Sequence, residues 1–279
     1  METTLTDEQR GTGERADVNG IRLYYEVHGP ASATRTLILL HGGLGSGGDF
    51  AAILPALSEG RRCILVDLQG HGRTADIDRP IDVQLMAGDI AALIGHLGLE
   101  RPDVLGYSLG GGVAFFVAAR HPELVGKVIV VSAHIRSDAI YPEMRAQQRQ
   151  LGAPTAEMLD GTPMFNLYQR VAPNPGGFAQ LLDKIGASMT TEFDFADVVR
   201  SLQVPTLIAC GDADMAPPSH YVEVFNLLGG GLRDGGWMGE GRAAGSHALA
   251  IIPGATHYDV ATSPALAAAA IAFLDAADR

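Results

Sequence analysis

Short apolar, β-rich runs alternate with helical segments through most of this 279-residue chain, and this alternation constrains the fold more than any other feature. Most of the runs are apolar throughout, as expected for strands of a parallel sheet that is covered on both faces. The sequence therefore predicts an α/β fold with a mixed, mainly parallel, twisted sheet and helices on both faces. The strands predicted in this way are Thr36–Leu40, Cys63–Asp67, Asp103–Gly106, Val128–Ser132, Pro205–Cys210 and Ala248–Ile252.

Local signals add elements near both ends of the chain. Asn19 and Gly20 divide the segment Arg15–Val27 into two strands, because both residues tolerate the positive φ angles of a tight hairpin. Ser263 before Pro264 predicts a helix start, with the serine as N-cap and the proline at the first helical position. The predicted helices are Phe50–Ser58, Val83–Leu97, Leu109–Arg120, Ser219–Leu228 and Pro264–Ala277.

The alternation breaks once, from His134 to about Gln203, where short helical segments are separated by proline and glycine. We interpret residues 134–203 as a helical cap, or lid, inserted into a core domain made of residues 1–133 and 204–279. Part of the cap would fill its own core, and part would wall a pocket for a moderately apolar small molecule. The candidate substrate-binding residues are Leu44, Tyr107, Met144, Met164, Phe165, Tyr168 and Met215.

The glycine-rich stretch Gly229–Gly245 precedes the last predicted strand and contains Trp237, the chain's one tryptophan. Its composition predicts a mobile surface loop. Trp237 would either shield the active site or dock on a partner surface, and the sequence leaves both roles open.

The charge balance limits the partners, because 32 Asp and Glu residues against 20 Lys and Arg give a net charge of -12. Because a surface this acidic repels phosphate backbones and anionic lipids, we expect neither nucleic acid nor membrane as a partner. No apolar run reaches the roughly 18 residues of a membrane span. Met1–Asp17 lacks the apolar stretch of a secretory signal, so we expect a cytoplasmic location. Cys63 and Cys210 lie in apolar runs without metal-ligand spacing and are predicted to be reduced core thiols.

The sequence Gly106-Tyr107-Ser108-Leu109-Gly110 is a G-x-S-x-G pattern between a predicted strand and a predicted helix. So sharp a turn forces strained angles on its central residue and leaves no room for side chains at the flanking glycines. The turn would hold the Ser108 hydroxyl beside a helix N-terminus, whose free N–H groups favour developing negative charge. Ser108 is therefore the candidate nucleophile.

With four further stretches, each following a predicted strand, this turn makes the chain resemble the α/β-hydrolase family from about residue 21 to 277. His41–Gly43 looks like the family's oxyanion-loop motif, and Asp67–Thr74 is similar to its D-x-x-G-x-G-x-S/T turn. Gly211–Asp214 resembles the acid loop, and Pro253–His257 resembles the histidine loop. The resemblance implies an α/β-hydrolase fold and a carboxylesterase-like serine hydrolase that uses no metal and no organic cofactor.

The same resemblance assigns a catalytic triad of Ser108, Asp214 and His257, in the chain order expected of this fold. A serine hydroxyl needs a base that takes its proton, and an imidazole can then return that proton to the leaving alcohol. A carboxylate must fix the tautomer of the imidazole. Asp214 is the fourth residue of its loop, which usually serves in the family; Asp212 is the alternative, and Asp138 is a distant third.

Two backbone N–H groups would stabilise the tetrahedral oxyanion. The resemblance assigns them to Gly43 and Leu109, with Leu44 as a substitute if the loop is shifted. His41 is expected to brace this loop, and His134 would face the pocket from the start of the cap. The histidines expected at the surface or at helix ends are His28, His96, His121, His220 and His247.

Two other classes of protein are to be weighed against an esterase. Gly43–Gly48 also fits G-x-G-x-x-G, and Asp67 follows it by 19 residues, near the spacing of a ribose-binding acid in a nicotinamide-dependent dehydrogenase. That assignment leaves the serine turn and His257 without roles. A non-catalytic ligand receptor on the same scaffold could keep a triad and stays open. Among hydrolases, C–C bond hydrolase, lactonase and cofactor-free perhydrolase activities stay open, as does the oligomeric state.

Overall fold

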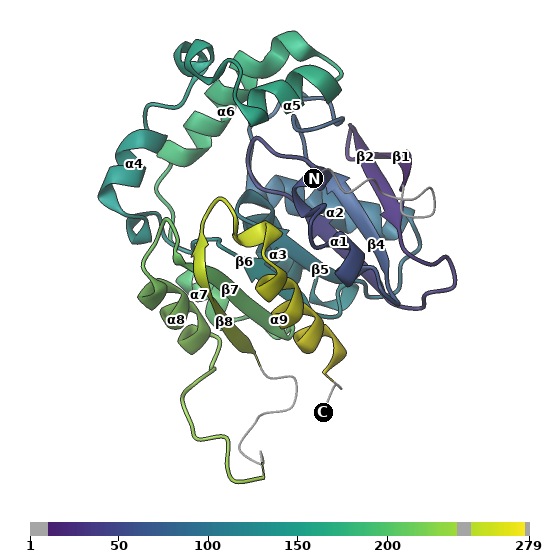
Figure 1. The fold of residues 1–279 in the computed structure, drawn as a ribbon, viewed down its shortest axis with the longest axis vertical. Helices are drawn as coiled ribbons and strands as arrows, with labels where there is room; N and C mark the ends of the chain where they lie inside the picture. The colour runs from purple at the N-terminus through teal and green to yellow at the C-terminus, as the bar shows by residue number, and fades with distance from the viewer. Residues whose placement is uncertain (1–10, 239–246, 277–279) are drawn as a thin grey trace.

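The computed structural model describes residues 11–238 and 247–276, and within them eight strands form one sheet in the order β1-β2-β4-β3-β5-β6-β7-β8 (Figure 1). The first two strands add to the sheet antiparallel, and every later neighbour is parallel. The mixed, mainly parallel sheet predicted from the sequence is confirmed. The strands are β1 (Thr12–Val18), β2 (Ile21–His28), β3 (Thr36–Leu40), β4 (Arg62–Asp67), β5 (Asp103–Tyr107), β6 (Val128–Val131), β7 (Thr206–Ala213) and β8 (Ala248–Thr256).

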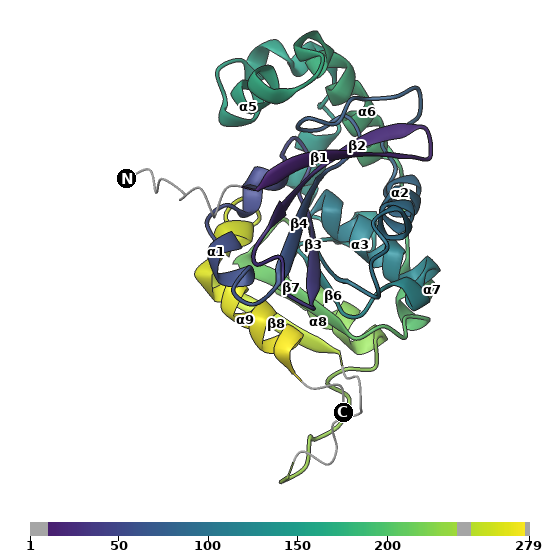
Figure 2. The ribbon, with the colours of Figure 1, turned by 90° about the vertical axis from the view of Figure 1, so that its right-hand side faces the viewer.

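Helices cover both faces of the sheet (Figure 2). On one face lie α2 (Val83–His96), α3 (Leu109–Arg120) and α8 (Pro218–Leu227). On the other lie α1 (Leu54–Leu57) and α9 (Pro264–Asp275). The central strands are apolar throughout because both of their faces are buried, and all four residues of β6 are buried.

Local chemistry sets several element boundaries. Asn19 and Gly20 have φ angles of 47° and 78°, so the predicted hairpin turn between β1 and β2 is confirmed. The Ser263 side chain accepts a hydrogen bond from the backbone of Ala265, as an N-cap does. The helix predicted over Phe50–Ser58 is wrong: a 3-10 turn ends at Phe50, and α1 is one turn long. Pro55 explains the break, because proline is tolerated only in the first turn of a helix.

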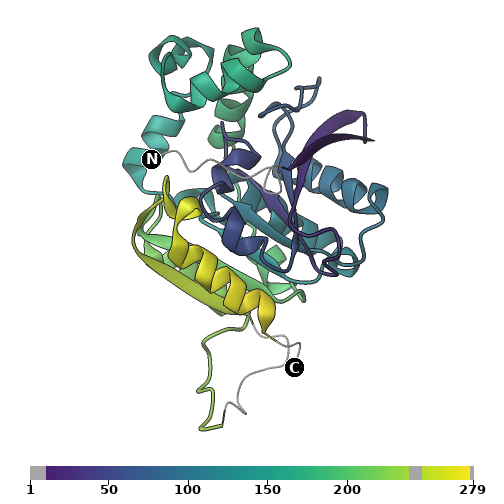
Figure 3. The ribbon, with the colours of Figure 1, turned by 45° about the vertical axis from the view of Figure 1, so that its right-hand side comes forward.

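Between β6 and β7 the described chain forms helices, with a single bridge between Arg136 and Asp194 as its one piece of β pairing. We call residues 134–203 the helical insertion. Three of its helices stand over the carboxyl ends of the strands, whereas the fourth packs beside α8 of the core (Figures 1 and 3). These helices are α4 (Pro142–Gln148), α5 (Pro163–Val171), α6 (Phe178–Thr190) and α7 (Ala196–Arg200).

The loop that follows α8 leaves the molecule at the end opposite the helical insertion (Figure 3). Trp237 on this loop is 96% exposed. It therefore does not shield the carboxyl ends of the strands, one of the two roles that the sequence allowed. The predicted loop continues into residues 239–246, which lie outside the described residues.

Cys63 and Cys210 are buried and free, as predicted. Burial raises the pKa of each thiol to about 12, so both stay protonated at neutral pH. Within the described residues, no helix combines the length and the apolar character that a membrane crossing demands.

Candidate active site

Ser108 occupies a strained turn between β5 and α3, with φ 52° and ψ -114°. Few residues other than glycine adopt such a positive φ, and the surrounding packing must hold it in place. A Cβ atom on Gly106 would lie 2.0 Å from the Gly110 carbonyl oxygen, and one on Gly110 would lie 2.2 Å from that of Leu40. Both positions therefore require glycine, and the elbow predicted from G-x-S-x-G is confirmed.

Three loops from distant parts of the sequence bring Ser108, His257 and Asp214 together. The Ser108 Oγ atom lies 3.0 Å from His257 Nε2, and His257 Nδ1 lies 2.7 Å from Asp214 Oδ1. Asp212, the alternative acid, is exposed and accepts a hydrogen bond from the Gly254 backbone instead. The third choice, Asp138, is exposed and pairs with Arg136 instead. The structure therefore places the first-choice acid against the imidazole.

Asp214 accepts four hydrogen bonds. Its Oδ1 atom receives those of His257 and the Met215 N–H, while Oδ2 receives those of the Ser132 hydroxyl at 2.5 Å and the Gly211 N–H at 3.4 Å. Burial alone would raise the pKa of Asp214, but the bonds from His257 and Ser132 outweigh it and hold that pKa below its usual 3.8. The carboxylate is therefore charged at neutral pH and fixes Nδ1 of His257 as the protonated nitrogen, which leaves Nε2 free to accept from Ser108.

Ser132, at the end of β6, is a member of the site that no sequence pattern indicated. It is 1% exposed, has a φ of 53°, and its hydroxyl donates to the carboxylate of Asp214. A residue held in the left-handed region beside a catalytic-type carboxylate indicates a positioning role. Its hydroxyl acts on Asp214 and not on a reacting atom.

We expect Ser132→Ala to lower turnover about tenfold and the free energy of unfolding by about 1.5–3 kcal/mol at neutral pH, since it removes a hydrogen bond to a charge. Because the folded pKa of Asp214 is depressed, this stability difference is fully present above pH 3.8 and is lost as the pH falls through the lower folded pKa. Denaturant unfolding at decreasing pH measures it. Ser132→Gly is the matched control. Its turnover should fall as much as that of Ser132→Ala, but its free energy of unfolding should fall less, because glycine tolerates the positive φ. Equal stability of wild type and Ser132→Ala at neutral pH would contradict this role.

Tyr107 and His134 are two of the aromatic side chains that contact the imidazole of His257. The Tyr107 hydroxyl donates a 2.5 Å hydrogen bond to the His257 carbonyl, so it fixes the histidine loop. The ring of His134 lies nearly parallel to that of His257, with 6.2 Å between centroids and 15° between planes. His134 therefore adjoins the site, as predicted for the first residue of the insertion.

The loop His41–Gly43, which resembles the family's oxyanion loop, is held in place by the hydrogen bonds of His41. His41 is buried; its Nδ1 donates to the Gly42 carbonyl and its Nε2 accepts from the Leu68 N–H, which confirms the predicted bracing role. Leu44 has a φ of 61° and packs against the core. Gly43 is exposed, and Leu109 opens α3, where backbone N–H groups have no partner within the helix. The assignment of these two N–H groups to an oxyanion hole stays a prediction.

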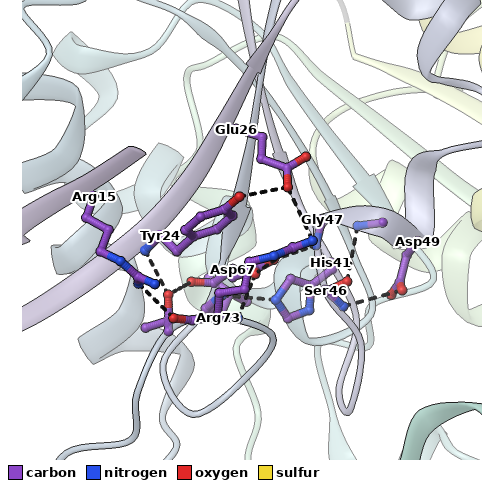
Figure 4. Close-up of polar contacts among 12 residues, drawn as sticks. Arg15, Tyr24, Glu26, His41, Ser46, Gly47, Asp49, Asp67 and Arg73 are labelled. Atoms are coloured by element: carbon purple, nitrogen blue, oxygen red, sulfur yellow. Dashed lines mark hydrogen bonds and ion pairs between the residues drawn. The ribbon is translucent and has the colours of Figure 1, made fainter. Parts of the chain in front are cut away.

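Asp67 links this loop to the D-x-x-G-x-G-x-T turn (Figure 4). One of its carboxylate oxygens accepts from the Gly47 N–H at 2.7 Å and the other from the Arg73 N–H at 2.8 Å. The Asp67 side chain is 2% exposed. An acid that must hold a ribose has to face the nucleotide, whereas this one is fully engaged inside the protein, so the geometry disfavours the dinucleotide-binding alternative.

The other candidate substrate-binding residues lie mostly in the insertion. Phe165 and Tyr168 both pack on Phe178, with ring centroids 5.1 and 5.2 Å apart. A hollow of about 460 Å³ beside Phe165 is also lined by Ala156, Glu157 and Asp160. Met144 is partly buried on α4, Met164 is exposed on α5, and the Met215 carbonyl accepts from Tyr141 of the insertion. Their contact with substrate stays a prediction.

Within residues 11–238 and 247–276, no group of three or more His, Cys, Asp or Glu side chains is arranged to hold a metal ion.

Comparison with known proteins identifies the family. The family model for the alpha/beta hydrolase fold matches residues 35–228, which is more than half of the chain. A putative carbamate hydrolase RutD from Rhizobium rhizogenes is 35% identical over 217 residues, 70% of this chain and 81% of that protein. A bifunctional esterase/perhydrolase DCH from Acinetobacter calcoaceticus is 27% identical over 227 residues, 72% of this chain and 81% of that protein. The chain therefore belongs to the α/β-hydrolase family and is a hydrolase.

Other matches are shorter or structural. The RutD of a Caulobacter species is 39% identical over 118 residues, which span 42% of this chain and 44% of that protein. A thermophilic esterase from Thermogutta terrifontis superimposes with a TM-score of 0.70 over 94% of this chain and 98% of its own, at 20% identity. The second match shows the fold alone.

Proposed function

We propose that this chain is a serine hydrolase that cleaves a small, moderately apolar carboxylic ester through an acyl-enzyme on Ser108. The observation that carries the proposal is the continuous hydrogen-bonded chain from the Ser108 hydroxyl through His257 to Asp214. The strained elbow supports it, because strain at a serine next to a helix N-terminus has no structural purpose evident from its contacts.

The chemistry follows from the proton positions. His257 Nε2 takes the hydroxyl proton as Ser108 Oγ attacks the ester carbonyl, and Asp214 stabilises the imidazolium that forms. The backbone N–H groups of Gly43 and Leu109 receive the oxyanion. His257 then gives the proton to the leaving alcohol, and a water molecule that it deprotonates releases the acid. The helical insertion serves as the lid, with Met144 and Met164 toward the substrate.

Carbamate cleavage is the second candidate, because a relative that covers most of this chain carries the name of a putative carbamate hydrolase. A carbamate undergoes the same addition and elimination at its carbonyl carbon, with a carbamoyl-serine in place of the acyl-serine. C–C bond hydrolysis, lactone opening, peracid formation and ligand reception without turnover would use the same pocket.

Active-site titration tests the proposal. We expect p-nitrophenyl butyrate to release a burst of one p-nitrophenol per chain, followed by slower steady turnover, since acylation by so activated an ester should be faster than deacylation. A fluorophosphonate should label each chain once, at Ser108, as read by peptide mass spectrometry. A p-nitrophenyl carbamate run in parallel ranks the two candidates by kcat/KM. A chain that neither reacts with the phosphonate nor turns over any of these compounds is not a serine hydrolase.

A further inference from the structure

Three imidazoles lie side by side: those of His257, of His134 at the start of the helical insertion, and of His220 on α8. The His134 ring is 6.2 Å from that of His257 and 6.1 Å from that of His220, measured between centroids. Tyr221, fully buried on α8, has its hydroxyl oxygen 3.3 Å from His134 Nε2. His134 is thus enclosed on three sides, yet its side chain is only partly buried.

The contacts of the neighbours decide which nitrogen of His134 carries the proton. The Tyr221 hydroxyl also lies close to the Asp214 carboxylate, but Asp214 already accepts four hydrogen bonds, and the contact of the hydroxyl that meets hydrogen-bond geometry is with His134 Nε2. We therefore assign the hydroxyl as the donor to His134 Nε2. Burial holds the pKa of Tyr221 well above its usual 10, and burial next to His257 lowers the pKa of His134 to about 3. A neutral imidazole that accepts at Nε2 carries its hydrogen on Nδ1.

This Nδ1–H group is available. Among the described residues, His134 Nδ1 has no hydrogen-bond partner. The atom is also not fully enclosed by protein, so a ligand can reach it. The group stands beside the imidazole that activates Ser108, at the junction of the sheet and the insertion. Because the group is accessible and adjoins His257, a substrate bound at Ser108 can replace water as its acceptor.

We propose that His134 is a substrate-binding residue, whose Nδ1–H donates a hydrogen bond to an uncharged acceptor oxygen close to the scissile bond. The inference rests on the proposed hydrolysis and narrows its substrates to esters or carbamates that carry an ether or carbonyl oxygen nearby. We take the acceptor to be uncharged because Arg136, the described cation two residues along the chain, is already paired with Asp138 and Glu223 and so is not free to balance an anion. A carboxylate would also face the charge of Asp214.

Isosteric ester pairs test this inference. p-Nitrophenyl methoxyacetate and p-nitrophenyl butyrate differ by one oxygen in the acyl half, and 2-methoxyethyl butyrate and butyl butyrate differ by one oxygen in the alcohol half. We expect His134→Phe to lower kcat/KM for the oxygen-containing member of at least one pair by about three- to tenfold more than for its isostere. His134→Asn, which keeps an N–H near the Nδ1 position, should retain the discrimination. Tyr221→Phe removes the hydroxyl that fixes the tautomer of His134, so it should reduce the discrimination within a pair by an intermediate factor.

Binding to the Ser108→Ala background separates this inference from the proposed reaction. Calorimetry of the same four esters with Ser108→Ala and with Ser108→Ala/His134→Phe reads the hydrogen bond without any turnover. A selective loss for an oxygen-containing ester supports the role of His134 even if wild type hydrolyses none of them. Equal effects of His134→Phe on both members of both pairs, in kinetics and in binding, would overturn it and assign His134 to the support of His257.

Discussion

Ser108→Ala should lower turnover of p-nitrophenyl butyrate by on the order of 10⁶-fold while the protein stays folded. The expected loss is this large because the hydroxyl, the imidazole and the carboxylate act as a unit, so that removing the nucleophile leaves only substrate binding and the oxyanion donors. The hydroxyl contributes one hydrogen bond, 3.0 Å long, to His257, so its removal costs little stability. Steady-state kinetics and a thermal melt on the same preparation measure both quantities.

Ser263→Ala is the matched control, because it makes the same substitution at a serine that serves only as the N-cap of α9. It should lower the free energy of unfolding by about 1 kcal/mol and leave turnover at the wild-type level. Ser108→Ala should therefore lose turnover and keep its stability, whereas Ser263→Ala should lose stability and keep its turnover. Residual activity of Ser108→Ala within tenfold of wild type would mean that another group attacks the substrate.

The elbow and the mainly parallel character of the sheet could be predicted because steric rules act within a few residues. Gly106 and Gly110 must lack side chains wherever a strand turns this sharply into a helix, and uniformly apolar runs require a sheet that is covered on both sides. The same rules predicted the hairpin at Asn19. They could not decide between Asp212 and Asp214, because that choice depends on how β7 and its loop meet the histidine loop 43 residues later.

The network around Asp214 was missed for a different reason. Ser132 contacts a carboxylate 82 residues away, and a single serine at the end of a strand carries no pattern that indicates such a contact. For His220 a signal was present. It lies four residues before Val224, on the face of α8 that packs on the sheet, so helical periodicity predicts burial. His220 does lie in the first turn of α8, as a histidine at a helix end would, but it is buried, with 3% of its surface exposed. For His28 the expectation of a surface or helix-end position was wrong: it ends β2 and is 8% exposed.

The second large effect is expected at the acid. Asp214→Asn should lower kcat by about 10⁴-fold, because an amide cannot hold the imidazole in the tautomer that accepts the Ser108 proton or stabilise its cation. The cost extends to folding. Asp214 accepts on both oxygens, so the NH₂ group of an asparagine must face buried donors such as the Ser132 hydroxyl, at about 1–3 kcal/mol. Kinetics and denaturant unfolding measure the two losses.

Asp212→Asn is the control that the chain itself provides, two residues away in the same loop. Its exposed carboxylate accepts a single hydrogen bond, from the Gly254 N–H at 2.9 Å, and an amide oxygen accepts that bond equally well. Turnover and stability should therefore stay near the wild-type values. A large loss of turnover in Asp212→Asn together with normal turnover in Asp214→Asn would show that Asp212, and not Asp214, orients His257. In that case the 2.7 Å contact between Asp214 and His257 would be structural only.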